Sequence, residues 1–197
     1  MKKLTAFIGA ILSLIPLGHP LFIKTGMVLS TIGMIYNFEK VHANDADYYY
    51  DLARDNFNKG NFKKVILNLN TSIKINPNFA AAYVARCGTR VNLQEYEKAI
   101  TDCAKAFQLN IKDSSNYIDR NALYSNLCAA KSAIGEHNSA LIDCNTAIIL
   151  DSKNSISFKN RGIVKENLGD MRGACSDWEI SANLGNLDSK DYLNNLC

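Results

Sequence analysis

Residues 96–103, with the sequence YEKAITDC, form a phrase that returns along the chain in shortened copies. The copies are ALIDC at 140–144, ACSDW at 174–178 and a weaker FKKVILNL at 62–69. In each copy, a large aromatic residue lies about sixteen residues before a small residue of the phrase, which is Val65, Ala99, Ala140 or Ala174. These aromatic residues are Tyr49, Tyr83, Tyr124 and Phe158, at spacings of 34, 41 and 34 residues. A repeat with this period predicts stacked supersecondary units rather than one compact core.

The period and the residue pattern resemble the tetratricopeptide repeat (TPR), a helix–turn–helix unit of 34 residues. With the aromatic residue at position 4, units begin at 46, 80, 121 and 155. Position 20, which is small in the family, then reads Val65, Ala99, Ala140 and Ala174. Position 8 reads Ala53, Cys87, Cys128 and Gly162, and position 24 reads Leu69, Cys103, Cys144 and Trp178. Small residues at positions 8 and 20 allow two antiparallel helices to approach closely.

The resemblance implies an all-α solenoid of about four repeats over residues 46–197, closed by a capping helix at 187–197. Seven extra residues around 112–117 lengthen the second unit, which predicts a longer loop or an extended helix there. Gly60, Gly135 and Gly169 are expected in the turns within the units, where a positive φ is needed. The closing segment 174–197 is also similar to the last repeat of small exported bacterial TPR proteins, many of them cyanobacterial.

Residues 1–43 are predicted to be a signal peptide or a membrane anchor. Apart from Lys24, the chain is uncharged from residue 4 to residue 38, which makes membrane contact through these residues possible. Val41 and Ala43 fit the small-residue rule of signal peptidase, so we expect export with cleavage after Ala43, into a periplasm or a thylakoid lumen. An uncleaved, membrane-anchored form is the alternative.

Composition excludes several classes of function. Residues 1–43 hold four basic residues and one acidic residue, so the formal charge of +3 lies there and the rest of the chain is neutral. A neutral body has no general attraction for phosphate, so no nucleic-acid partner is expected. His137 is the one histidine after residue 43, and no CxxC or short metal-ligand spacing is present. We therefore expect no catalytic residue, no metal and no cofactor.

The six cysteines fall within the repeats. Cys87 with Cys103, and Cys128 with Cys144, occupy positions 8 and 24, where buried thiols and disulfides remain alternatives. Cys175 and Cys197 would join the last repeat to its capping helix. Such a bond closes a loop of about 20 residues and stabilises by roughly 3 kcal/mol.

In the TPR family the first helix of each unit lines a concave groove, and positions 5, 9 and 12 point into it. The resemblance therefore implies a non-enzymatic module that binds a protein or peptide segment, as a scaffold or assembly factor outside the cytoplasm. A membrane-anchored organiser of a membrane complex is the alternative, and a thiol-redox enzyme is the least favoured reading. The predicted groove residues are Tyr50, Arg54, Phe57, Asn92, Asn126, Lys159 and Asn160. The lysine and asparagine set with which some family members clamp a C-terminal carboxylate is absent at the matching positions.

Overall fold

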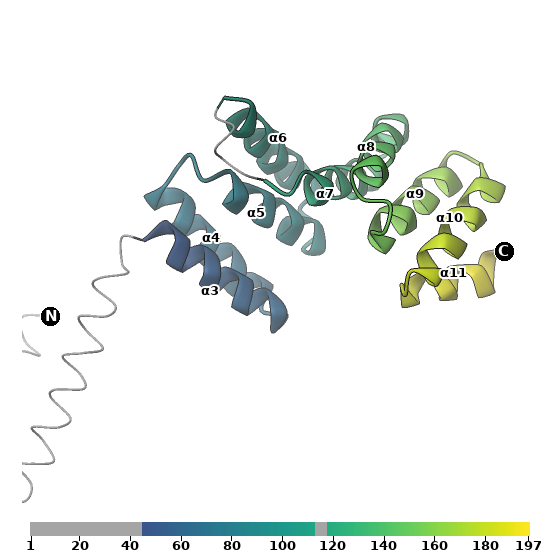
Figure 1. The fold of residues 1–197 in the computed structure, drawn as a ribbon, viewed down its shortest axis with the longest axis horizontal. Helices are drawn as coiled ribbons and strands as arrows, with labels where there is room; N and C mark the ends of the chain where they lie inside the picture. Colours follow the sequence, from purple (N-terminus) through teal and green to yellow (C-terminus); the bar gives the residue numbers. More distant parts are fainter. Residues whose placement is uncertain (1–44, 113–117) are drawn as a thin grey trace, which may run out of the picture. The chain divides into compact units, whose positions relative to one another are not determined.

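The structure, a computed structural model, describes residues 45–112 and 118–197. The predicted signal peptide or anchor at 1–43 lies outside the described residues. Within those residues every regular element is an α-helix, and no helix is both long and apolar enough to cross a bilayer. The helices are α3 (Ala46–Asn58), α4 (Phe62–Ile75), α5 (Ala80–Asn92), α6 (Tyr96–Lys112), α7 (Arg120–Ala133), α8 (His137–Leu150), α9 (Ser155–Asn167), α10 (Met171–Asn183) and α11 (Leu187–Leu196) (Figure 1).

The helices pack as successive antiparallel pairs, α3 with α4, α5 with α6, α7 with α8, and α9 with α10. Each second helix also contacts the first helix of the next pair, and α11 packs on α10. The first helices α5, α7 and α9 contact one another in turn, which places them together along one side of the described solenoid (Figure 1). The all-α solenoid expected from the sequence is confirmed in the described residues.

Small residues allow the close approach of the helices within each pair. Val65, Ala99, Ala140 and Ala174 are at most 2% exposed. In the fourth pair Gly162 lies beneath Trp178, and a Cβ on this glycine would overlap the indole ring. The indole therefore fills the space that a side chain at position 162 would need.

In the turn within each pair, a residue after the first helix adopts the left-handed backbone conformation, with a positive φ. Gly60, Gly135 and Gly169 have φ values of 70°, 86° and 82°, as predicted for these turns. The second pair has Gln94 in the same place, with φ 60°. Because a Cβ makes this conformation less favourable by about 1 kcal/mol, glycine is the better residue there.

The longer second unit is accommodated partly by α6. This helix has 17 residues, against 14 in α4 and in α8. After residues 113–117, which are outside the described residues, Asp119 caps α7 by accepting a hydrogen bond from the backbone N–H of Ala122 at 3.0 Å.

Three disulfides join helices at the places named from the sequence. Cys87–Cys103 joins α5 to α6, Cys128–Cys144 joins α7 to α8, and Cys175–Cys197 joins α10 to the end of the chain. The corresponding Cα–Cα distances are 5.5, 5.1 and 5.9 Å. The first two are fully buried, whereas Cys197 is exposed.

Three of the pairs have a buried aspartate at position 23 of the unit, on the second helix. Asp102 is bound by Arg86, at 2.8 and 2.7 Å, and by Arg90 at 2.6 Å. Asp177 is bound by Arg161, at 2.8 and 2.6 Å, and by Lys165 at 2.8 Å. These aspartates neutralise the charges of the first helix of their own pair, so they are structural.

The third pair keeps the aspartate but has one cation. Asp143 lies 2.7 Å from the Nζ of Lys131, which also donates to the Ser139 hydroxyl at 2.9 Å. Leu127 occupies the position of Arg86 and Arg161. The pKa of Asp143 is raised: burial is the largest cause, the hydrogen bond and the charge of Lys131 lower the pKa, and the charge of Glu136 raises it further.

The last helix, α11, is held to α10 and α9 by several contacts. Tyr192 stacks on Trp178 with ring centroids 4.9 Å apart. Ser189 donates to the Ser181 hydroxyl at 2.8 Å, and Asp188 pairs with Lys159 of α9 at 2.9 Å. The apolar side of the fourth pair is thereby covered.

Candidate partner-binding groove

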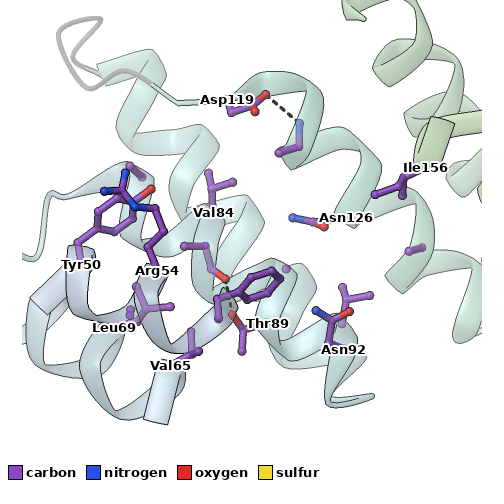
Figure 2. A pocket seen from close by; sticks show the side chains of 18 of the residues that line it. Tyr50, Arg54, Val65, Leu69, Val84, Thr89, Asn92, Asp119, Asn126 and Ile156 are labelled. Carbon is purple, nitrogen blue, oxygen red and sulfur yellow. Dashed lines mark hydrogen bonds between the residues drawn. The ribbon is translucent and has the colours of Figure 1, made fainter. Parts of the chain in front are cut away.

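A cavity of about 550 Å³ lies along the first helices α3, α5, α7 and α9 (Figure 2). Ligand pockets in proteins usually enclose about 300–1,000 Å³. Tyr50, Arg54, Phe57, Asn92, Asn126, Lys159 and Asn160, the seven residues named from the sequence, all line it. The structure therefore brings together side chains that are up to 110 residues apart in the chain. We call this cavity the groove.

Of the other residues at positions 5, 9 and 12, Glu166 lines neither this groove nor the neighbouring cavity, and the rest divide into three groups. Val84, Gly88, Val91 and Ala129 line the groove. Ser132 and Ile163 line a neighbouring cavity instead. Ser125 is buried, because the amide of Asn160 lies over it, 3.4 Å from its carbonyl oxygen and 3.5 Å from its hydroxyl.

An aromatic and charged cluster forms the α3 end of the groove. Figure 2 shows the side chains of Tyr50 and Arg54 at this end. The ring of Tyr50 lies 5.1 Å from that of Phe79, and Arg54 pairs with Asp51 at 3.1 Å. Burial raises the pKa of Tyr50, Arg54 lowers it, and the charges of Asp51 and Asp119 raise it further. The phenol is therefore neutral throughout the physiological pH range.

Two amide side chains are presented in the middle of the groove. Figure 2 shows the amide of Asn126 on α7. It lies over Gly88, where a Cβ would come within 2.9 Å of the amide nitrogen. Among the described residues, neither Asn126 nor Asn92 uses its side chain in a hydrogen bond. An amide offers both donors and an acceptor, which suits the backbone of an extended peptide.

A second cavity of about 490 Å³ adjoins the groove, and the two share Val91, Ala129 and Asn160. We call it the second chamber. Its lining includes Tyr96 and His137, which begin α6 and α8. Sequence reasoning missed this chamber because it considered only first helices. Position 17 of the units, at the start of each second helix, could have indicated it. Phe62, Tyr96 and Met171 are large there, and His137 is polar.

All six cysteines are in disulfides, so no thiol is free to act as a nucleophile. Within residues 45–112 and 118–197, no group of three histidine, cysteine or acidic side chains could hold a metal. What the groove offers is apolar surface, a few neutral hydrogen-bonding groups and the charged side chains of Arg54, Asp119 and Lys159.

No family model and no curated protein matches the sequence. Solved structures match the fold, among them MamA from Desulfovibrio magneticus RS-1, at a TM-score of 0.62 and 14% identity over 82% of this chain and 88% of that one. The second TPR domain of human RPAP3, in complex with an HSP70 peptide, matches at 0.51 and 22% identity, covering 61% and 94%. The chain has a TPR fold. The Arabidopsis OM64 TPR domain also matches, at 0.54 and 17% identity, covering 64% of this chain and 98% of its own.

Proposed function

We propose that this TPR fold is a non-enzymatic interaction module that binds a peptide or protein segment in the groove. The main support for this proposal is that all seven predicted residues line one cavity along α3, α5, α7 and α9. Two solved neighbours were determined with HSP70 and HSP90 peptides, which supports a peptide ligand for a fold of this kind.

The compartment that we propose is outside the cytoplasm. Three disulfides in a chain of 197 residues fit an oxidising location, where such bonds persist. Export after cleavage at Ala43 would deliver residues 46–197 there as a scaffold or assembly factor.

A measurement of intact mass tests the compartment. The protein is isolated from its native cells and alkylated without prior reduction. We expect the mass of a chain that starts at Asn44 and carries no alkylated cysteine. A full-length mass with six alkylated cysteines would contradict export and favour the membrane-anchored alternative.

Peptide selection tests the groove. Random peptides of about twelve residues, a length that extends over about 40 Å, are selected on the immobilised full chain. Ala129→Trp and the milder Asn92→Trp should fill the groove and reduce the affinity of the selected peptides by about tenfold or more. Ile149→Trp on α8 is the matched control, because residue 149 is 83% exposed and lies outside both cavities. If Ile149→Trp reduced affinity as much as the groove variants, the assignment would fail.

A further inference from the structure

We propose that the partner segment is uncharged and comes from the interior of a polypeptide, not from an acidic chain end. This inference rests on the proposed function and specifies the chemistry of the ligand. It follows from how the charged groups of the groove are already used, and from the continuation of the groove into the second chamber.

Each charged side chain in the groove lining already has a partner. Arg54 pairs with Asp51 at 3.1 Å, and Lys159 pairs with Asp188 at 2.9 Å. Asp119 accepts the N–H of Ala122. A ligand carboxylate at Arg54 or Lys159 would lie beside Asp51 or Asp188, whose charge already balances the cation and repels a second carboxylate. The groove therefore gives no net advantage to an acidic ligand.

The middle of the groove favours a neutral backbone instead. Val84 and Ala129 provide apolar surface, and the amides of Asn92 and Asn126 are available for hydrogen bonds. The phenol of Tyr50 is neutral at physiological pH, and burial raises its pKa further, so it adds a neutral hydroxyl at the α3 end. Apolar surface with amide groups matches an extended segment of small apolar or amide side chains.

The groove does not end in a cluster of cations. Beyond Asn160 it continues into the second chamber, whose lining contains the imidazole of His137 and no lysine, arginine, aspartate or glutamate. A terminal carboxylate would find no cationic group there. A segment that runs on through the chamber keeps its backbone uncharged, so an interior segment fits better than a chain end.

The test uses two peptide pools on the immobilised full chain. One pool has twelve random residues without Asp, Glu, Lys or Arg and an amidated end. The other has eight random residues chosen from the same residue types, followed by EEVD with a free carboxylate. The neutral pool should be enriched by at least about tenfold over the acidic pool. Binding of its members should change less than about twofold between low and high salt, because screening affects only charged contacts.

Charge variants sharpen the test. Arg54→Gln and Lys159→Gln each remove a cation of the groove lining, and the ratio of neutral-pool to acidic-pool enrichment should change by less than about threefold in each, as in Arg172→Gln, which removes an exposed cation outside the groove. Preferential enrichment of the EEVD pool, lost in Lys159→Gln but not in Arg172→Gln, would overturn the inference and leave the proposed function intact. Enrichment of neither pool over the Ala129→Trp and Asn92→Trp variants would overturn both.

Discussion

In the third helical pair, formed by α7 and α8, Cys128 is bonded to Cys144, whereas at the same two positions of the fourth pair Gly162 lies beneath Trp178. The aspartate directly before Cys144 or Trp178 differs as well. Asp177 has two cationic partners and a side chain only 2% exposed, and Asp143 has one partner and is 9% exposed. The same backbone unit is thus held by a covalent bond in one case and by packing and ion pairs in the other.

The difference shows that a repeat position specifies geometry rather than chemistry. Positions 8 and 24 must bring two helices into contact, and either a disulfide or a glycine under a large ring does so. The ion pair of the aspartate, by contrast, depends on the residue sixteen places upstream. For Asp177 that residue is Arg161, which binds it, and for Asp143 it is Leu127, which carries no charge. Each pair should therefore respond to a different perturbation.

Trp178→Ala should give the largest effect on the fourth pair. Truncating a fully buried tryptophan leaves a cavity and removes the stack with Tyr192, so we expect a loss of about 4 kcal/mol in the free energy of unfolding. Urea unfolding followed by circular dichroism measures it. Tyr192→Leu should have a smaller effect, because it removes the stack alone, and equal losses would contradict the packing argument.

Cys128→Ala with Cys144→Ala should weaken the third pair in particular. Removing a bond that closes a loop of this length destabilises by about 3 kcal/mol. Hydrogen exchange should speed up in α7 and α8 more than in α9 and α10. Cys175→Ser with Cys197→Ser is the matched control, which should loosen α11 and leave α7 and α8 protected. Uniform acceleration over all helices in the first double variant would show that the pairs are not independent.

Asp177→Asn and Asp143→Asn compare the two ion networks directly. The first leaves Arg161 and Lys165 without their buried counter-charge and should destabilise by about 2–3 kcal/mol. The second removes a carboxylate that burial already disfavours, and should change stability by less than about 1 kcal/mol. Denaturant unfolding at neutral pH measures the free energy of unfolding of both variants. A larger loss of stability for Asp143→Asn than for Asp177→Asn would contradict this ranking.

The pH dependence of Asp143 is the smallest expected effect. Its pKa is raised in the folded protein, so the folded state holds the proton more tightly than the unfolded state does. The free energy of unfolding should therefore fall as pH rises from the unfolded pKa to the folded pKa, and the contribution stays unfavourable above that range. Asp143→Asn should abolish this decrease, which is measured as the difference between the two proteins from acidic to neutral pH. A difference of the opposite slope would mean that Lys131 outweighs burial.

Much of the fold follows from the sequence because the repeat forces a register. Once Tyr83 and Phe158 are placed at position 4, the positions of the small residues and of the turn glycines are determined. The groove residues follow for the same reason. The register cannot show which polar groups satisfy each other, so it missed the pairing of Lys159 with Asp188 and the burial of Ser125 under Asn160. It also missed the second chamber, since His137 reaches it from the start of a second helix.

The single tryptophan of the chain is also its natural optical reporter. Trp178 is fully buried in α10 and stacked on Tyr192 of α11, so its emission senses the C-terminal pair and its capping helix. A fluorescence unfolding curve of this protein is therefore a local measurement, whereas circular dichroism averages over all the helices. Because repeat proteins can unfold in parts, a difference between the two midpoints would measure how strongly the last repeat is coupled to the others.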